Sequence, residues 1–172
     1  TYDAISVHGG SGFIMEYKAQ RLYRDARIFS IYEGTTQLQV VAAARYITNG
    51  TYLGIMKEML VENVSDDMKP LQMRIAQLVT LYEKALEKVN SSECQDEKDF
   101  LARRLYDMTA EIIMSLLIIS DASKSPELFK TSANVYVRMT EENVIGKAAY
   151  IEAFKAEDLC YFANEMSDKE SE

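Results

Sequence analysis

Glu33 is the residue of this sequence best suited to acid–base chemistry. It stands directly before Gly34, and Thr35 and Thr36 follow at the expected start of a helix. A carboxylate becomes an effective base when bound substrate excludes water and raises its pKa. The glycine lets another group approach the backbone closely, while threonines at a helix start direct N–H and hydroxyl donors toward one spot. These residue types suit a base beside an anionic or carbonyl-rich ligand, although a Glu-Gly pair alone is typical of a surface loop.

A glycine-rich turn, Gly9-Gly10-Ser11-Gly12, follows the single histidine, His8. The turn lacks the Gly-Lys-Ser/Thr of a phosphate-binding loop and follows no evident strand, so it does not read as a known nucleotide-binding motif. His8 suits either a nucleotide contact or a structural role. One histidine and two distant cysteines, Cys94 and Cys160, fit no metal spacing, so we expect no metal site and reduced thiols.

Three arginines, Arg21, Arg24 and Arg27, lie one helical turn apart. Such a row can bind phosphate. Asp25 lies among them, and a carboxylate beside arginines forms ion pairs. We therefore expect structural ion pairs to Asp25 in this segment rather than an anion site.

The elements that must position these residues are predicted to be helices, giving an all-α helical bundle. Seven glycines and two prolines in 172 residues argue against a turn-rich β fold. Apolar residues recur at steps of three and four along each long segment. Gly146, inside the penultimate segment, is expected at a close helix contact. The predicted helices are 2–8, a helix from Gly34-Thr35-Thr36 to Asn49-Gly50, 68–90, 96–122, one from Pro126 through Ile151, and 156–166, with 52–62 a short helix or extended linker.

Composition divides the chain near Ser65. Residues 1–64 hold six basic and six acidic side chains, whereas the remainder holds 13 and 21 and so carries the whole net charge of −8. Six of the seven glycines also precede Ser65. We therefore expect a domain at 1–64, an up-down helical extension at 65–166 and a disordered tail at 167–172.

The acidic balance disfavours nucleic acid and anionic membranes as partners. No uncharged apolar run approaches the ~18 residues of a membrane-spanning helix, and the start lacks a basic and apolar signal sequence. We therefore expect a cytoplasmic protein. The sequence begins Thr-Tyr-Asp-Ala-Ile without Met, which suggests a fragment of a longer protein.

Three motifs together resemble the end of the catalytic region of acyl-CoA dehydrogenases. They are Gly9-Gly10-Ser11-Gly12, the segment Arg24-Asp25-Ala26-Arg27-Ile28, and Tyr32-Glu33-Gly34-Thr35-Thr36-Gln37, in the family's order and spacing. The resemblance covers roughly the first 48 residues. It places them at the end of the family's C-terminal four-helix domain, with residues 65–166 as a helical extension of the kind that larger members carry.

The resemblance implies roles for these residues. Glu33 would remove the α-proton of an acyl-CoA thioester while flavin N5 takes the β-hydrogen as hydride, which yields a trans-2-enoyl-CoA. Gly34 would line the acyl-CoA site. The FAD-binding residues would be Thr35, Thr36 and Gln37, together with Ser6, Val7, His8, Gly9 and Gly10, which match a segment that touches the FAD of a neighbouring subunit.

The family also implies FAD as cofactor, electron-transfer flavoprotein as acceptor and a homo-oligomer. Because the flavin-binding β-domain lies upstream of this region in the family, we expect the chain alone to be inactive and free of flavin. We also expect residues 1–64 to expose apolar surface and self-associate. The alternative is a non-enzymatic helical interaction or oligomerisation module in which Glu33-Gly34 is only a turn.

Overall fold

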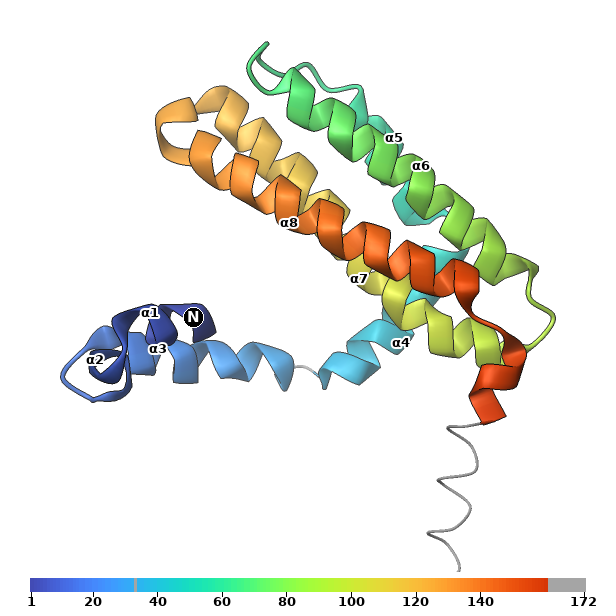
Figure 1. Ribbon diagram of the computed structural model, residues 1–172, viewed down its shortest axis with the longest axis horizontal. Helices are drawn as coiled ribbons and strands as arrows, with labels where there is room; N and C mark the ends of the chain where they lie inside the picture. Colours follow the sequence, from blue (N-terminus) through green and yellow to red (C-terminus); the bar gives the residue numbers. More distant parts are fainter. Residues whose placement is uncertain (33, 161–172) are drawn as a thin grey trace, which may run out of the picture. The chain divides into compact units, whose positions relative to one another are not determined.

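The computed structural model describes residues 1–32 and 34–160, so Glu33 and the predicted tail at 167–172 lie outside the described residues. Within these ranges the chain is helical and contains no strand, which confirms the predicted all-α class (Figure 1). The contacts divide the chain into two compact units, Thr1–Ala42 and Ala43–Glu172. The two units are described separately.

The first unit consists of short helices with little buried surface. Gly12 and Val40 are its buried residues in the part of the chain that the structure describes, and Val7 and Phe29 are 86% and 80% exposed. This unit therefore has no hydrophobic core of its own. Its elements are α1 (Tyr2–His8), α2 (Gly10–Phe13), α3 (Lys18–Arg27), the 3₁₀ turn η1 (Ile28–Ser30) and the start of α4 (Thr36–Thr48).

The second unit is built on three long helices that run up, down and up beside one another (Figure 1). Ser125 alone separates the last two, because its neighbour Pro126 starts a new helix at the first helical position. The predicted up-down arrangement of the long helices is thus confirmed. The elements are α5 (Thr51–Leu60), α6 (Lys69–Ser91), α7 (Gln95–Lys124), α8 (Pro126–Ala153) and the 3₁₀ turn η2 (Ala156–Asp158).

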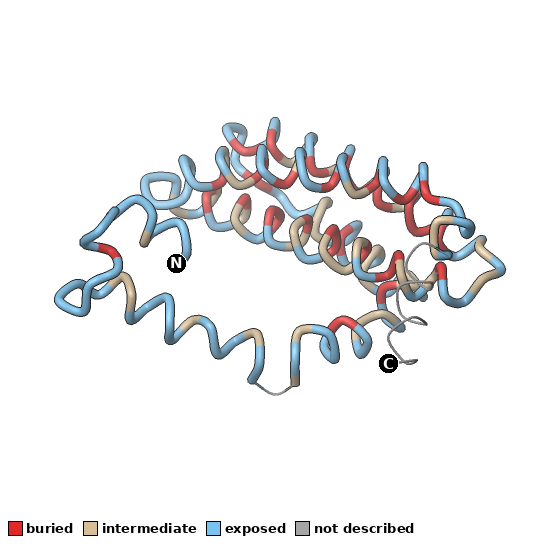
Figure 2. The backbone as a smooth tube through the Cα atoms, turned by 60° about the horizontal axis from the view of Figure 1, so that its bottom comes forward, coloured by how far each residue is buried: buried red, intermediate tan, exposed pale blue. Residues whose placement is uncertain are grey.

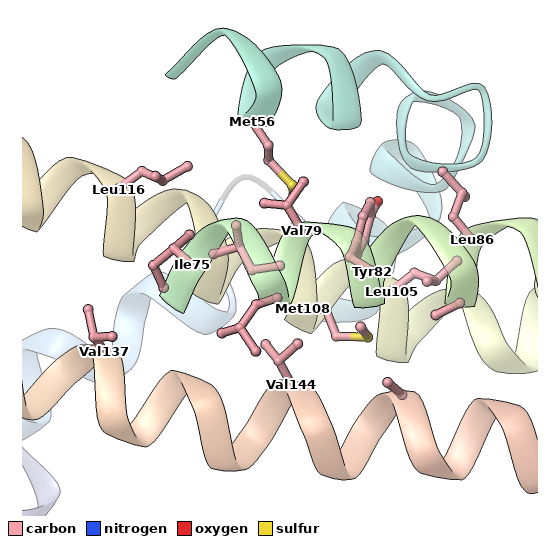
Figure 3. Packing of buried hydrophobic residues seen from close by; sticks show 14 of the residues in the cluster. Met56, Ile75, Val79, Tyr82, Leu86, Leu105, Met108, Leu116, Val137 and Val144 are labelled. Carbon is pink, nitrogen blue, oxygen red and sulfur yellow. The ribbon is translucent and has the colours of Figure 1, made fainter. Parts of the chain in front are cut away.

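The apolar stripes predicted for α6 and α7 form the core of the second unit, and every residue of both stripes is buried (Figures 2 and 3). For α8 the periodicity predicts the stripe Phe129, Ala133, Tyr136, Thr140, Val144, Ala148 and Ile151. Two positions differ in the structure: Phe129 is 37% exposed, and Tyr136 is only half-buried while Val137 is fully buried in its place. Steps of three and four reach either position from Ala133, so periodicity alone does not separate them. The buried stripes are Leu71, Ile75, Leu78, Tyr82, Leu86 and Val89 on α6, and Leu101, Leu105, Met108, Ile112, Leu116 and Ile119 on α7.

The core also includes residues that precede Ser65. Met56 of α5 is fully buried and Ile47 is 1% exposed, and both belong to the cluster of the long helices. Residues 52–62 are therefore mainly helix, not an extended linker. The division between the compact units falls at Ala42 and Ala43, whereas the shift in composition falls near Ser65. The shift in charge and glycine content falls where the long helices begin, whereas the burial of Ile47 and Met56 shows that the core begins earlier in the sequence.

Of the predicted helix at 156–166, the described residues contain the 3₁₀ turn Ala156–Asp158 and then Leu159 and Cys160, which are α-helical; residues 161–166 lie outside the described residues. One local expectation differs from the structure. A Cβ on Gly146 would meet no atom of the described chain within 4 Å. Gly146 is therefore not at a close contact between helices of this chain.

Candidate functional site

The candidate site is the turn that leads into α4, directly after Glu33. Gly34 has a φ of +109°, a backbone conformation that other residues rarely adopt. A Cβ at this position would also lie 3.3 Å from Nε2 of Gln39. The turn therefore depends on glycine for its backbone angle, and the side chain of Gln39 lies close to it.

Thr35 caps α4, as the sequence predicts. The Leu38 N–H donates to Thr35 Oγ1 at 3.4 Å, and the Gln39 N–H donates to the Thr35 carbonyl at 3.1 Å. The preceding N–H groups, those of Thr36 and Gln37, have no acceptor among the described residues. The positive end of a helix with two available N–H donors suits an anionic or carbonyl oxygen.

Thr36 anchors the turn on its other side and borders a hollow in the first unit. Its hydroxyl donates to the Ser30 carbonyl at 3.2 Å. The hollow has a volume of about 360 Å³ and combines aromatic walls with the Arg27 guanidinium. Its lining is Thr1, Tyr23, Ala26, Arg27, Phe29, Ser30 and Thr36.

Ion pairs between the arginines of α3 and Asp25 are absent among the described residues, so that expectation is wrong. Arg27 instead hydrogen-bonds to the Ser30 hydroxyl. The geometry of a helix explains the difference: Arg24 neighbours Asp25 in sequence and points to another face, while Arg21 precedes Asp25 by four residues in the less favourable orientation.

The glycine-rich turn joins α1 to α2. Gly9 has a φ of +59°, and the His8 ring Nδ1 lies 2.8 Å from the Ala4 carbonyl, a contact that fixes the ring against its own helix when Nδ1 carries the proton. Ser6, Val7 and Gly10 are exposed. The sequence did not single out Gly12, yet a Cβ there would lie 2.5 Å from the Ile5 carbonyl oxygen.

The structure thus gathers part of the predicted site and leaves part of it apart. Gly34, Thr35 and Thr36 share one turn, and Gln37 follows with an exposed side chain. Ser6 to Gly10 form a separate segment at the end of α1. Arg27 and Ser30 lie beside Thr36, although the sequence analysis did not predict them as site residues. The row of arginines could have indicated Arg27, whereas nothing in the sequence indicated that the Ser30 carbonyl would accept a hydrogen bond.

Two sequence profiles match the chain and together cover nearly all of its described part. The profile described as "Acyl-CoA dehydrogenase, C-terminal domain" matches residues 1–48, and that described as "Acyl-CoA dehydrogenase C terminal" matches residues 48–159. The chain belongs to the acyl-CoA dehydrogenase family. The first profile spans the candidate turn and the glycine-rich turn, and the second spans the long helices. The resemblance seen in the motifs is therefore confirmed.

Relatives of this acyl-CoA dehydrogenase family chain agree with that assignment. The "Caffeyl-CoA reductase-Etf complex subunit CarC" of Acetobacterium woodii is 61% identical over 36 residues, which are 21% of this chain and 10% of the relative. An "Acyl-CoA dehydrogenase" of Bacillus subtilis is 41% identical over 49 residues, 28% of this chain and 13% of the relative. The matches thus span about a tenth of the length of these curated relatives.

A solved structure resembles the chain over a longer stretch. The acyl-CoA dehydrogenase family protein from Porphyromonas gingivalis has a TM-score of 0.62 and 30% sequence identity, over 66% of this chain and 98% of that chain. That chain is matched almost from end to end.

The described residues contain neither a metal-binding cluster nor a membrane-spanning helix. Within residues 1–32 and 34–160, no three His, Cys, Asp or Glu side chains gather as a metal ion would need. In the same part of the chain, no helix has the length and apolar character to cross a bilayer. Cys94 and Cys160 are free thiols.

Proposed function

We propose that this chain is the C-terminal part of an FAD-dependent acyl-CoA dehydrogenase and that Glu33 removes the α-proton of the acyl-CoA. The observation that carries the proposal is Gly34, which holds a φ of +109° immediately after Glu33 within the segment that matches the family profile. Such a turn leaves open backbone next to the N-terminus of α4. An acyl-CoA that approaches the backbone of Gly34 would meet the residue that precedes it, Glu33, whose carboxylate can take the α-proton.

FAD is the cofactor that the family implies, and the residues present fit it. The N–H groups of Thr36 and Gln37 are without described acceptors, and Gly9 and Gly10 have open space where a Cβ would stand. Thr35, Thr36 and Gln37 would hold one FAD, and the segment from Ser6 to Gly10 would touch that of a neighbouring subunit in a homo-oligomer. When bound, FAD supplies the acceptor for the β-hydrogen. The chain's own contribution is the base, the open backbone of Gly34 and the donors of α4.

The reaction we propose is oxidation of an acyl-CoA thioester to a trans-2-enoyl-CoA, with electrons passed to electron-transfer flavoprotein. One relative is named as an acyl-CoA dehydrogenase and another as a subunit of a caffeyl-CoA reductase-Etf complex. The first supports the direction and the second supports the partner. We further propose a cytoplasmic location.

We also propose that the 172 residues alone bind no flavin and turn over no acyl-CoA. Their matches cover only about a tenth of the curated relatives, and the flavin ring needs the family's β-domain. Purified chain with a stoichiometric yellow absorbance would contradict this.

The test of the proposed reaction uses the longer protein that contains this sequence. We would compare wild type, Glu33→Gln and, as control, Glu16→Gln, which changes an exposed carboxylate of the same unit. Flavin bleaching by a panel of acyl-CoAs should be lost in Glu33→Gln with FAD still bound and retained in Glu16→Gln. Equal bleaching in all three proteins would exclude Glu33 as the base. A reading frame without flavin-binding sequence upstream would favour the interaction module instead.

A further inference from the structure

The outer face of α8 carries large apolar side chains that no part of the described chain covers. Leu128, Val135, Met139 and Ile145 are 68%, 54%, 56% and 53% exposed. The opposite face of the same helix is the core stripe that includes Val137 and Val144, both fully buried (Figure 3). Large apolar side chains that are exposed close together on a surface mark a candidate contact with a partner.

Exposed positions on this face recur at alternating steps of three and four. This spacing keeps one line of side chains along a straight contact between two helices, as in a coiled coil. Seven positions of α8 follow this spacing, and all seven are exposed. We call them the outer seam of α8: Thr131, Val135, Arg138, Glu142, Ile145, Ala149 and Glu152.

Two charges lie in the middle of the outer seam and form no ion pair with any described residue, namely Arg138 and Glu142. Three other charged residues of α8 do bond to the neighbouring helices or loop. Lys130 pairs with Asp67 at 2.7 Å, Glu141 with Arg74 at 2.8 Å, and Lys147 with Glu111 at 3.1 Å. The charged residues on the flanks of α8 therefore pair within this chain, whereas Arg138 and Glu142 of the seam remain available to a partner.

We propose that the outer seam binds the outer seam of a second copy of this chain, antiparallel and with the two-fold axis midway between Arg138 and Glu142. In that register the six seam positions from Thr131 to Ala149 pair with one another. Arg138 meets Glu142 of the other copy twice, Val135 meets Ile145 twice, and Thr131 meets Ala149 twice. Such a contact is isologous and closes as a dimer.

This complementarity is the reason for choosing a second copy over another protein. If α8 bound a different protein, nothing would require its charged and apolar side chains to be arranged symmetrically about one point. Gly146 lies beside the seam, and the described chain fills none of the space that a Cβ would take. A glycine there leaves room for a second helix.

The test reverses one charge at a time in the full chain. Arg138→Glu and Glu142→Arg should each weaken dimerisation about tenfold or more, because two like-charge contacts replace two opposite ones. The double variant Arg138→Glu/Glu142→Arg should restore it. The decisive measurement mixes the two single variants, since a heterodimer of them contains only opposite pairs. Native mass spectrometry should then show heterodimer where each variant alone is mostly monomer, and far-UV circular dichroism should show that all variants remain folded.

Three outcomes would overturn the proposal. The first is a wild-type chain that stays monomeric through the micromolar range. The second is association that is equal in the wild type and both single variants, which would place the contact elsewhere, for instance on the exposed apolar surface of Thr1–Ala42. The third is a mixture of the single variants without heterodimer, which would exclude the antiparallel register. None of these measurements depends on flavin or on acyl-CoA chemistry, so they leave the proposed function untouched.

Discussion

Ser115 of α7 donates a hydrogen bond to Thr140 of α8 at 2.9 Å, and both hydroxyls lie in the core with their residues 0% and 2% exposed. The bond crosses the buried part of the interface between two helices that are also joined, nearer the surface, by the ion pair of Lys147 with Glu111. A hydroxyl buried without a partner costs about 1–3 kcal/mol. The pair therefore favours one alignment of α7 on α8, because shifting either helix by one residue would separate the two hydroxyls.

The first prediction follows from that bond. Thr140→Val should lower the free energy of unfolding by about 1–3 kcal/mol, because the buried Ser115 hydroxyl loses its acceptor. The double variant Ser115→Ala/Thr140→Val should recover most of this loss, since both polar groups are then gone. Urea unfolding of the full chain measures both. Additive losses in the double variant would mean that the two hydroxyls do not depend on each other.

The second prediction concerns stability at alkaline pH. Burial raises the pKa of Tyr82 above its ordinary value of 10.0, and the hydrogen bond from Thr109 at 3.0 Å only partly offsets this. Above pH 10 the unfolded chain loses the tyrosine proton while the folded chain keeps it. Stability from this residue is therefore fully present below pH 10 and declines as the pH rises toward the folded pKa.

Chemical unfolding between pH 8 and about 11.5 tests this with Tyr82→Phe. The difference in unfolding free energy between wild type and variant should shrink above pH 10. Tyr2→Phe is the control, since Tyr2 is 70% exposed. A difference for Tyr82→Phe that is flat with pH would show that the hydroxyl titrates equally in both states.

The helices and the stripes of α6 and α7 were predictable because one repeated signal, apolar residues at steps of three and four, sets both the helix and its buried face. The third stripe was harder, because α8 has apolar residues on both sides and Tyr136 and Val137 compete for the same inward position. Only packing against α6 and α7 decides between them. The burial of Met56 was not predicted for a different reason: the sequence of 52–62 was compatible with a short helix or with an extended linker.

Part of the candidate site was also readable from the sequence. A glycine followed by two threonines predicts a turn and a capped helix, and Thr35 caps α4. The hydrogen bond from Thr36 to the Ser30 carbonyl and the steric need for Gly12 were not readable. Both depend on backbone atoms that approach through the tertiary structure, and backbone atoms leave no mark on residue type.

The third prediction concerns Arg104, which lies between two aromatic rings. Its guanidinium carbon is 3.9 Å from the ring centre of Tyr150 and 4.7 Å from that of Phe100. Arg104→Lys keeps the charge and loses the flat stacking surface, so it should cost about 0.5–2 kcal/mol of stability. Thermal unfolding measures this. Arg103→Lys is the control, because the exposed Arg103 pairs with Asp107 at the surface and lies near a single ring, that of Tyr106, at the longer distance of 5.9 Å, so its replacement should change stability less. Equal effects of the two variants would argue against a contribution from stacking.

The last prediction separates two glycines of one turn. A Cβ on Gly12 would lie 2.5 Å from the Ile5 carbonyl oxygen and 2.9 Å from the Ile5 Cα, whereas a Cβ on Gly10 would meet nothing within 4 Å of the described chain. Neither glycine has a positive φ. Gly12→Ala must therefore push α1 away from α2, at a cost of about 1–3 kcal/mol, while Gly10→Ala should be neutral or slightly stabilising.

Hydrogen exchange of the amides of α1 measures this difference directly. Gly12→Ala should speed their exchange, since α1 holds its place through contacts to α2 and α3, and Gly10→Ala should not. The amides of α6 to α8 belong to the other compact unit and should be unchanged in both variants. Because Gly9 and Gly10 are the residues proposed to touch FAD, a Gly12→Ala chain with unaltered α1 exchange would mean that close packing at Gly12 does not position that turn.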